Sequence, residues 1–386
     1  MKKMTSVRFV AATLLALAGW AAACGDDDDA PNPGGGASGS GGASGSGGGG
    51  GRAGAGGAAG GAGAAGGAGA GGGASAVARG QYLATVVLDC LICHTPRNSL
   101  GVPALDQMFI GNDCLMDVVP DDDEKGCLPT KNLTNHSTGL ANLTDEQIKD
   151  IILNGVRPDG KAVIPVMPYY AYHNMKPEDA DAIVAYLRTL PGVDHLSPAP
   201  QAPFATPAAP APPVDRALIP SPEPSYPDQA AALRGRYIAG EMGVCMDCHT
   251  PLASDAPDAV PDFTKAFQGG RPFQSAAFNV SLPLPPTIYT SNLTPDATGT
   301  QGYTADVLAK TLIEGLDKDS KRLCPPMPSG PLGAYRDMTL QDATDLAHYL
   351  LSLKPVANPV PDECELPFRQ SGEIGQAVRP SPRRGH

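Results

Sequence analysis

Six residues of this 386-residue chain fall into two short motifs of identical pattern, Cys-x-x-Cys-His, each followed by Thr-Pro. The motifs consist of Cys90, Cys93 and His94, and of Cys245, Cys248 and His249. On a helical turn, thiols three residues apart lie on one side, and the adjoining imidazole projects from the same turn. This pattern is typical of c-type haem attachment, in which both thiols add to haem vinyl groups and the histidine binds the iron.

Paired cysteines also serve in zinc sites and in redox-active dithiols. A zinc site would require further paired ligands nearby, and a redox Cys-x-x-Cys does not need the following histidine. From composition alone, roughly 0.004 copies of the pattern are expected by chance, whereas two are present. The sequence therefore predicts two covalently attached haems with four cysteine attachment sites. We expect His94 and His249 to bind the irons and to donate from their second ring nitrogen to a backbone carbonyl.

The second axial ligand decides the chemistry of each iron. Histidine alone leaves a position open to peroxide or gases, whereas His/Met ligation closes the iron and raises its potential, as an electron carrier needs. We predict Met167 and Met327 as these ligands, because each lies in a proline-fixed loop that can carry a thioether across the haem face. Met175 and Met338 are the competing pair, but each begins a helix, where methionine more often packs in a core.

Amphipathic helices are expected to hold these residues. Apolar positions between residues 77 and 87 have helical spacing and lead into the first motif. Thr144 and Gln147 form a capping box that opens a helix ending near Gly155. A last helix, at about residues 177–190, places its large apolar side chains on one face.

The second half of the chain repeats the first. Residues shared at one offset of 160 are Asn132, Thr144, Gly155 and Met167, which correspond to Asn292, Thr304, Gly315 and Met327. Such internal similarity indicates duplication. The expected fold is all-α, with two tandem domains at residues 76–195 and 230–368. They are joined by an extended Pro/Ala-rich linker of polyproline character at residues 196–229.

The N-terminal region has the features of an export signal. Residues 1–24 combine a basic start, an apolar run too short to span a membrane comfortably and small residues before Cys24. The ending resembles a lipobox, so we expect a lipid anchor on Cys24 and a position on the periplasmic side of a membrane. Cleavage after Ala23 without lipid is the alternative. We expect a disordered Gly-rich tether at residues 25–75 and a disordered tail at 369–386.

Cysteine count and charge add two further expectations. Beyond the motifs and Cys24, four of the nine cysteines remain, which predicts one disulfide in each half of an exported chain. The expected pairs are Cys114 with Cys127 and Cys324 with Cys364. The formal net charge of −12 argues against nucleic acid as a partner. The acidic residues 121–124 are expected to form a solvated loop.

These residues resemble class I cytochromes c, and more closely the cytochrome c subunits of membrane-associated alcohol and gluconate dehydrogenases. The likeness rests on the Cys-x-x-Cys-His-Thr motifs, the two Asn-Leu-Thr segments, the Met-Pro pairs and the Tyr-Leu pairs of the last helices. It implies a small all-helical haem fold in each half, with Gly80 and Gly235 letting the first helix cross the last. Those subunits commonly carry three haem motifs, whereas this chain has two.

We therefore predict an exported, membrane-tethered dihaem cytochrome c. It would pass single electrons between a redox-protein donor and an acceptor, such as a membrane dehydrogenase or a terminal oxidase, with no substrate chemistry of its own. One alternative is a dihaem peroxidase with one open iron. Others are the cytochrome subunit of a dehydrogenase complex and a ligand-sensing haem protein.

Overall fold

The computed structural model describes residues 71–98, 100–256, 259–278 and 280–361, together with Cys364 and Leu366. The predicted signal peptide, lipid anchor on Cys24 and tail, and most of the predicted tether, lie outside the described residues. The last five residues assigned to the tether, 71–75, are helical. All described residues belong to one compact unit. We refer to residues 71–195 as the first half and to residues 230–361 as the second half.

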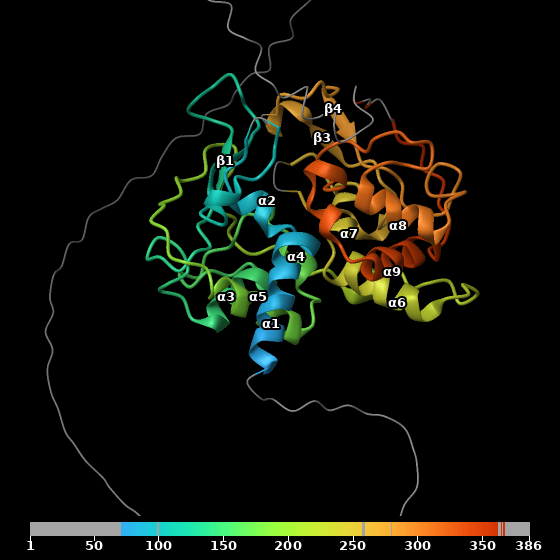
Figure 1. Ribbon diagram of the computed structural model, residues 1–386. Helices are drawn as coiled ribbons and strands as arrows, with labels where there is room; N and C mark the ends of the chain where they lie inside the picture. Colours follow the sequence, from blue (N-terminus) through green and yellow to red (C-terminus); the bar gives the residue numbers. More distant parts are fainter. Residues whose placement is uncertain are drawn as a thin grey trace, which may run out of the picture. The chain divides into compact units, whose positions relative to one another are not determined.

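Each half is built on two helices that pack against each other. In the first half, α1 (Gly71–Tyr82) packs on α5 (Pro177–Leu187). In the second half, α6 (Gln229–Arg236) packs on α9 (Leu340–Leu351). Figure 1 shows these two pairs in separate groups, blue with green and yellow with red.

Glycine permits both helix crossings. A Cβ atom added to Gly80 would lie 1.8 Å from the carbonyl oxygen of Ala182, and one added to Gly235 would lie 1.9 Å from that of Asp345. Neither distance is possible for a real side chain, so any larger residue would push the helices apart. The close crossing expected at these two glycines is confirmed.

The attachment motifs follow directly on the first helix of each half. A π-helical turn at Leu83–Val87 leads into α2 (Cys90–His94), and its counterpart at Tyr237–Glu241 leads into α7 (Val244–Cys248). Widened turns of this kind are rare and occur most often near functional sites. The helix expected ahead of the first motif is present, and its last turn is widened to a π-helical turn.

The middle helices begin and end as their sequences predict. The side chain of Thr144 accepts a hydrogen bond from the backbone N–H of Gln147 and opens α3 (Asp145–Asn154), completing the predicted capping box. In α8 (Ala305–Glu314), Thr304 has the same capping role. Both helices end at a glycine with positive φ, a conformation that glycine adopts without steric cost. A short helix, α4 (Tyr169–Tyr172), follows in the first half.

The expectation of an all-α fold is wrong. The structure also contains two antiparallel strand pairs, β1 (Asn112–Asp117) with β2 (Cys127–Thr130), and β3 (Pro272–Gln274) with β4 (Thr287–Tyr289). Each pair joins the two arms of a loop, whose backbone donors and acceptors must find partners where they are partly buried. In the first pair, residues 118–126 form the turn, and three of the four acidic residues there are exposed.

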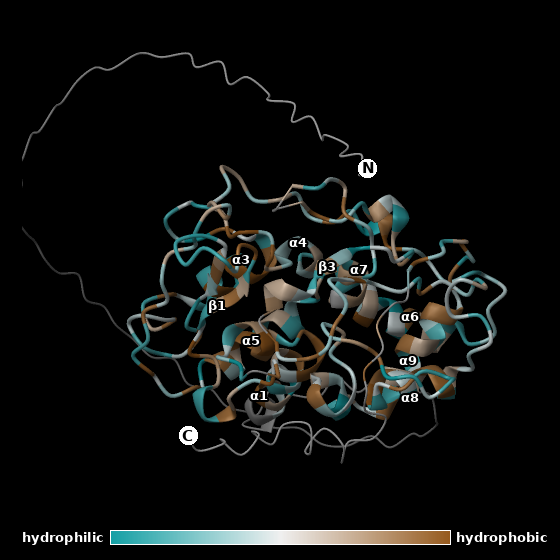
Figure 2. Ribbon diagram, turned by 90° about the horizontal axis from the view of Figure 1, so that it is seen from above, coloured by the Kyte–Doolittle hydropathy of each residue, from teal (hydrophilic) through white to brown (hydrophobic). Residues whose placement is uncertain are grey.

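Both expected disulfides are present, Cys114 with Cys127 and Cys324 with Cys364. Buried apolar side chains from both halves form one continuous hydrophobic cluster. Figure 2 shows brown, hydrophobic stretches along α5 and α9, the helices that supply much of this cluster. That each half is a domain in its own right stays a prediction of the sequence.

The Pro/Ala-rich segment at residues 196–229 packs against both halves. Val214 donates a 3.0 Å backbone hydrogen bond to Tyr170 in the first half, and Glu223 donates one of 2.8 Å to Ser352 in the second. Ile219 is 1% exposed and lies over Gly240, where an added Cβ would come within 2.3 Å of its side chain. Within the described ranges, no helix is long and apolar enough to cross a membrane.

Candidate functional site

The first motif occupies α2 and is capped by a buried carboxyl group. Asp89 has a positive φ of 47° and accepts a 3.3 Å hydrogen bond from the backbone N–H of Ile92. Burial raises the pKa of Asp89 to about 8, against the opposing effects of that hydrogen bond and of Arg97. At neutral pH this carboxyl group is therefore mostly uncharged.

The second motif carries a buried charge pair. Asp247, inside the Cys-Met-Asp-Cys turn, is 7% exposed. Its carboxylate lies 3.0 Å from Nη1 of Arg271 and accepts a 2.5 Å hydrogen bond from the hydroxyl of Tyr170, which belongs to the first half. Charge pairing satisfies a carboxylate that burial would otherwise make costly. The two motifs thus have different electrostatic surroundings.

Both motif histidines have the same backbone partner at equivalent positions. Nδ1 of His94 lies 2.7 Å from the carbonyl oxygen of Lys131, and Nδ1 of His249 lies 2.7 Å from that of Ser291. Burial lowers the pKa of both imidazoles and so favours their neutral forms. In a neutral imidazole that donates from Nδ1, the lone pair on Nε2 remains available for a metal. The backbone carbonyl expected for each histidine is confirmed.

Two buried asparagines hold the segments that carry these carbonyls. Asn132 is 1% exposed, accepts a 2.9 Å hydrogen bond from the backbone of Thr134 and donates one of 2.9 Å to the carbonyl of Val193. Asn292 makes the equivalent bonds of 3.0 Å to Thr294 and 2.8 Å to Val356. The sequence indicated the Asn-Leu-Thr segments as signs of duplication and of family resemblance, without a structural role. Each segment begins directly after the residue whose carbonyl oxygen binds the motif histidine. This repeated position was the signal in the sequence for a supporting role.

The threonine after each motif is also a structural support. Thr95 and Thr250 are both completely buried. Their hydroxyls accept hydrogen bonds of 3.0 Å and 3.3 Å from the backbones of Phe109 and Phe267, which tie the chain after each motif to the next loop.

The four candidate methionines fall into two classes. Met175 and Met338 are each 5% exposed and lie within the hydrophobic cluster, as expected of core side chains. Met167 and Met327 are only partly buried. No described contact joins either of them to His94 or His249, so their role as axial ligands stays a prediction.

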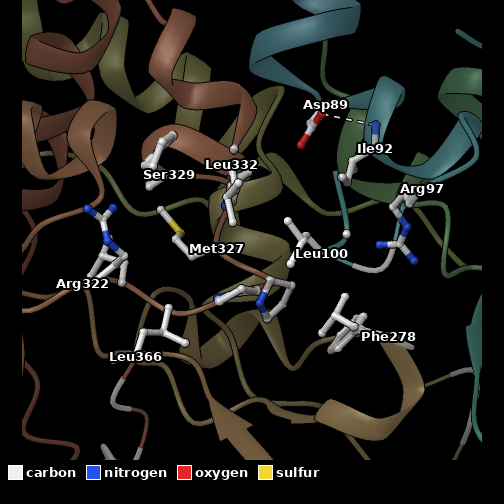
Figure 3. Close-up of a pocket in the computed structure, with 18 residues that line it drawn as sticks. Asp89, Ile92, Arg97, Leu100, Phe278, Arg322, Met327, Ser329, Leu332 and Leu366 are labelled. Atoms are coloured by element: carbon white, nitrogen blue, oxygen red, sulfur yellow. Dashed lines mark hydrogen bonds between the residues drawn. The ribbon is translucent and has the colours of Figure 1, made fainter. Parts of the chain in front are cut away.

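Met327 lines an open pocket. Figure 3 shows its sulfur near Ser329 and Leu332 of its own half, with Asp89, Ile92 and Leu100 on the opposite wall. The last three come from the first half. Residues of both halves line this pocket, so it marks the junction between them.

The motif cysteines suit thioether formation better than the other uses of paired thiols. All four are free, whereas the other described cysteines form disulfides. Burial is the largest cause that raises the pKa of Cys90, Cys93 and Cys248 to about 12 and that of Cys245 to about 11. A redox-active dithiol needs a lowered thiol pKa, so these values argue against that use. In the described part of the chain, no three His, Cys, Asp or Glu side chains are grouped to hold a metal ion.

No family model matches the chain. It is 31% identical over 182 residues to the fructose dehydrogenase cytochrome subunit of Gluconobacter japonicus, which covers 46% of this chain and 35% of that protein. It is 28% identical over 213 residues to the cytochrome c subunit of the quinone alcohol dehydrogenase of Gluconacetobacter polyoxogenes, covering 52% and 42%. The cytochrome c subunit of gluconate 2-dehydrogenase from Pantoea cypripedii is 28% identical over 190 residues, covering 45% and 38%.

The chain is similar to dehydrogenase cytochrome c subunits. This similarity agrees with the resemblance that the motifs indicated. The matches span 35–42% of the length of these three relatives. The activities in their names belong to complexes that extend well beyond the matched part.

Proposed function

We propose that this protein is a dihaem cytochrome c that carries single electrons between redox partners. The main support is the duplicated arrangement of free cysteine pair, neutral histidine and backbone carbonyl in the two motifs. Covalently bound haem iron supplies one-electron chemistry when it is present. The protein's own residues attach and orient the group.

Each residue has one role in this proposal. Thioether attachment falls to the four motif cysteines, and His94 and His249 are the proximal ligands. Lys131 and Ser291 fix the histidine rings through their carbonyl oxygens. Met167 and Met327 close the opposite face of each site, which would leave no position for peroxide or a substrate. Residues 76–195 and 230–368 would each form one haem domain.

The partners follow from the relatives and from the N-terminus. Several relatives are named as cytochrome subunits of fructose, alcohol and gluconate dehydrogenases. A dehydrogenase is therefore the electron donor that we propose, and a further redox protein the acceptor. Export and a lipid on Cys24 would keep the protein on the periplasmic side of a membrane, where such a donor could reach it.

Spectroscopy of the purified mature protein tests the proposal. We expect two haems per chain by mass and by pyridine haemochromogen assay, both low-spin and with a Met-to-iron charge-transfer band. Reduced protein should not bind carbon monoxide rapidly. Fewer than two haems, or an iron that takes up the gas at once, would contradict the proposal.

Methionine variants test the axial ligands separately. We expect Met167→Ala and Met327→Ala each to remove about half of the charge-transfer band, because each would open one iron. Met175→Leu and Met338→Leu are matched controls, since these methionines lie in the core and the substitution conserves their volume. Loss of the charge-transfer band in Met175→Leu or Met338→Leu would instead identify these methionines as the iron ligands.

A further inference from the structure

The two halves contact each other through equivalent residues in reciprocal fashion. The hydroxyl of Tyr82 donates a 2.6 Å hydrogen bond to Asp342, and that of Tyr237 donates one of 2.7 Å to Asp179. Tyr82 corresponds to Tyr237 in the duplicated sequence, and Asp179 to Asp342. Each hydroxyl also accepts a backbone N–H, from Thr339 and Lys176, which correspond as well.

Reciprocal pairing of this kind is the signature of a two-fold interface between like units. The larger elements obey the same rule. The π-helical turn at Leu83–Val87 contacts the short helix at Ala334–Asp337, and the turn at Tyr237–Glu241 contacts α4. The junction is therefore a pseudo-two-fold interface within one chain.

The attachment motifs lie close to this junction. Tyr170 of α4 is bonded to Asp247 inside the second motif, and Figure 1 and Figure 2 both show α4 beside α7. On the other side of the junction, Asp89 and Ile92 beside and within the first motif line the same pocket as Leu332. Each motif therefore adjoins the opposite half.

Two equivalent tyrosines, Tyr172 and Tyr335, are buried on the two short helices that contact the opposite half. They are 5% and 4% exposed. Tyr172 belongs to α4, which contacts the turn at Tyr237–Glu241 and is bonded to the second motif through Tyr170 and Asp247.

Tyr335 is placed in the same way. Its helix at Ala334–Asp337 contacts the π-helical turn at Leu83–Val87, which leads into the first motif. Each tyrosine thus belongs to a helix that packs against the turn leading into the opposite motif.

We propose that Tyr172 and Tyr335 are positioning residues that hold the two attachment motifs against each other across the pseudo-two-fold interface, so that electrons pass between the two attached haems within one chain. The step moves one electron, oxidising one iron from the ferrous to the ferric state while the other iron is reduced. No bond forms or breaks, and no further reactant is needed. This inference rests on the proposed dihaem function.

Circular dichroism in the Soret region measures the proposed proximity, because two neighbouring haems give a bisignate exciton couplet. We expect the couplet in the wild-type protein and its loss in Cys245→Ala/Cys248→Ala, which would retain one haem. The electron paramagnetic resonance spectrum of the oxidised protein should likewise differ from the sum of the spectra of that variant and of Cys90→Ala/Cys93→Ala, which would retain the other haem.

Tyrosine variants test the positioning role. We expect Tyr172→Leu/Tyr335→Leu to lower the couplet by more than half with both haems still attached. Tyr172→Phe/Tyr335→Phe should retain most of it, because the rings remain. Tyr303→Leu is the control, since this tyrosine packs against the hydrophobic cluster within the second half and its hydroxyl accepts a hydrogen bond from the backbone N–H of Lys318. It should lower stability and leave the couplet unchanged.

The outcomes separate the two proposals. Two attached haems without a couplet, or a couplet that survives in the double Leu variant, would overturn the positioning role and leave the dihaem function standing. A wild-type chain with fewer than two haems would overturn the dihaem function itself.

Discussion

The hydroxyl of Tyr82 lies 2.6 Å from a carboxylate oxygen of Asp342, 260 residues further along the chain. The same bond, from Tyr237 to Asp179, runs in the opposite direction between the halves at 2.7 Å. Burial and the bond to Asp342 raise the pKa of Tyr82 to about 12, so its proton stays in place at all physiological pH values. The halves are therefore joined by neutral donors and carboxylate acceptors.

Removing one of these hydroxyls should weaken the interface. We expect Tyr82→Phe to lower the free energy of unfolding by about 1 kcal/mol, because a half-buried hydrogen bond to a carboxylate is lost. Urea titration measures the effect. Tyr289→Phe is the control, since Tyr289 is 39% exposed. Equal stability of the two variants would contradict the role of the bond.

Acid should weaken the second of these bonds, from Tyr237 to Asp179. Burial opposes ionisation of Asp179, but hydrogen bonds from Arg79 and Tyr237 outweigh it and lower the pKa of the carboxyl group. A lowered pKa in the folded state contributes stability above the unfolded value of about 3.9. That stability is lost as pH falls through the folded value.

We therefore expect the wild-type free energy of unfolding to fall below about pH 4, and Asp179→Asn to show a smaller fall there. Asp181→Asn is the matched control, because Asp181 pairs with Lys149 at the surface. Parallel pH profiles for wild type and Asp179→Asn would refute this source of acid sensitivity.

The asparagine supports should matter for the histidines. Asn292→Ala would leave the backbone N–H of Thr294 without its acceptor and would remove one of the two side-chain donors to the carbonyl of Val356. We expect a loss of about 2 kcal/mol in stability, because buried polar groups become unsatisfied. A shift in the potential of one haem should accompany it. Asn154→Ala, at the surface, should change neither property, and an unshifted potential in Asn292→Ala would exclude the supporting role.

The helix crossings allow a sharp steric test. Gly235→Ala would place a methyl group 1.9 Å from a backbone oxygen that belongs to the packed helix α9. We expect at least about 3 kcal/mol of destabilisation and little folded protein. Gly302→Ala has open space around it but a φ of +84°, so it should cost about 1 kcal/mol. Similar thermal midpoints for the two variants would show that the crossing can relax.

Cys324 lies three residues before Met327 in the sequence. Its disulfide with Cys364 ties the loop that contains Met327 to the C-terminal segment. If Met327 is an iron ligand, Cys324→Ser/Cys364→Ser should weaken about half of the Met-to-iron band. Cys114→Ser/Cys127→Ser removes the other disulfide and is the control, because its loop carries neither candidate ligand. An unchanged band in Cys324→Ser/Cys364→Ser would show that the disulfide does not support the position of Met327.

Local patterns allowed much of this structure to be predicted. The motifs, the capping box at Thr144, the disulfide pairs and the crossings at Gly80 and Gly235 each depend on residues whose types limit what the backbone can do. The carbonyl partner of each histidine followed from the chemistry of the ring. These features need little knowledge of the distant chain.

The features that were missed depend on distant segments. The strands are only three to six residues long and lack alternating hydrophobicity, so no periodicity marked them. Tyr82 and Tyr237 were aligned as duplicates, but alignment does not reveal that each bonds to the opposite copy. The packing of Ile219 into the second half was hidden in a segment whose composition indicated a spacer.

The reciprocal interface has one last consequence. Two separate copies of such a half would have to meet by diffusion, and their association would fade as the solution became more dilute. Because this chain carries both copies, dilution cannot separate them. In the proposed function, an electron that reaches one half would therefore always have the other half beside it.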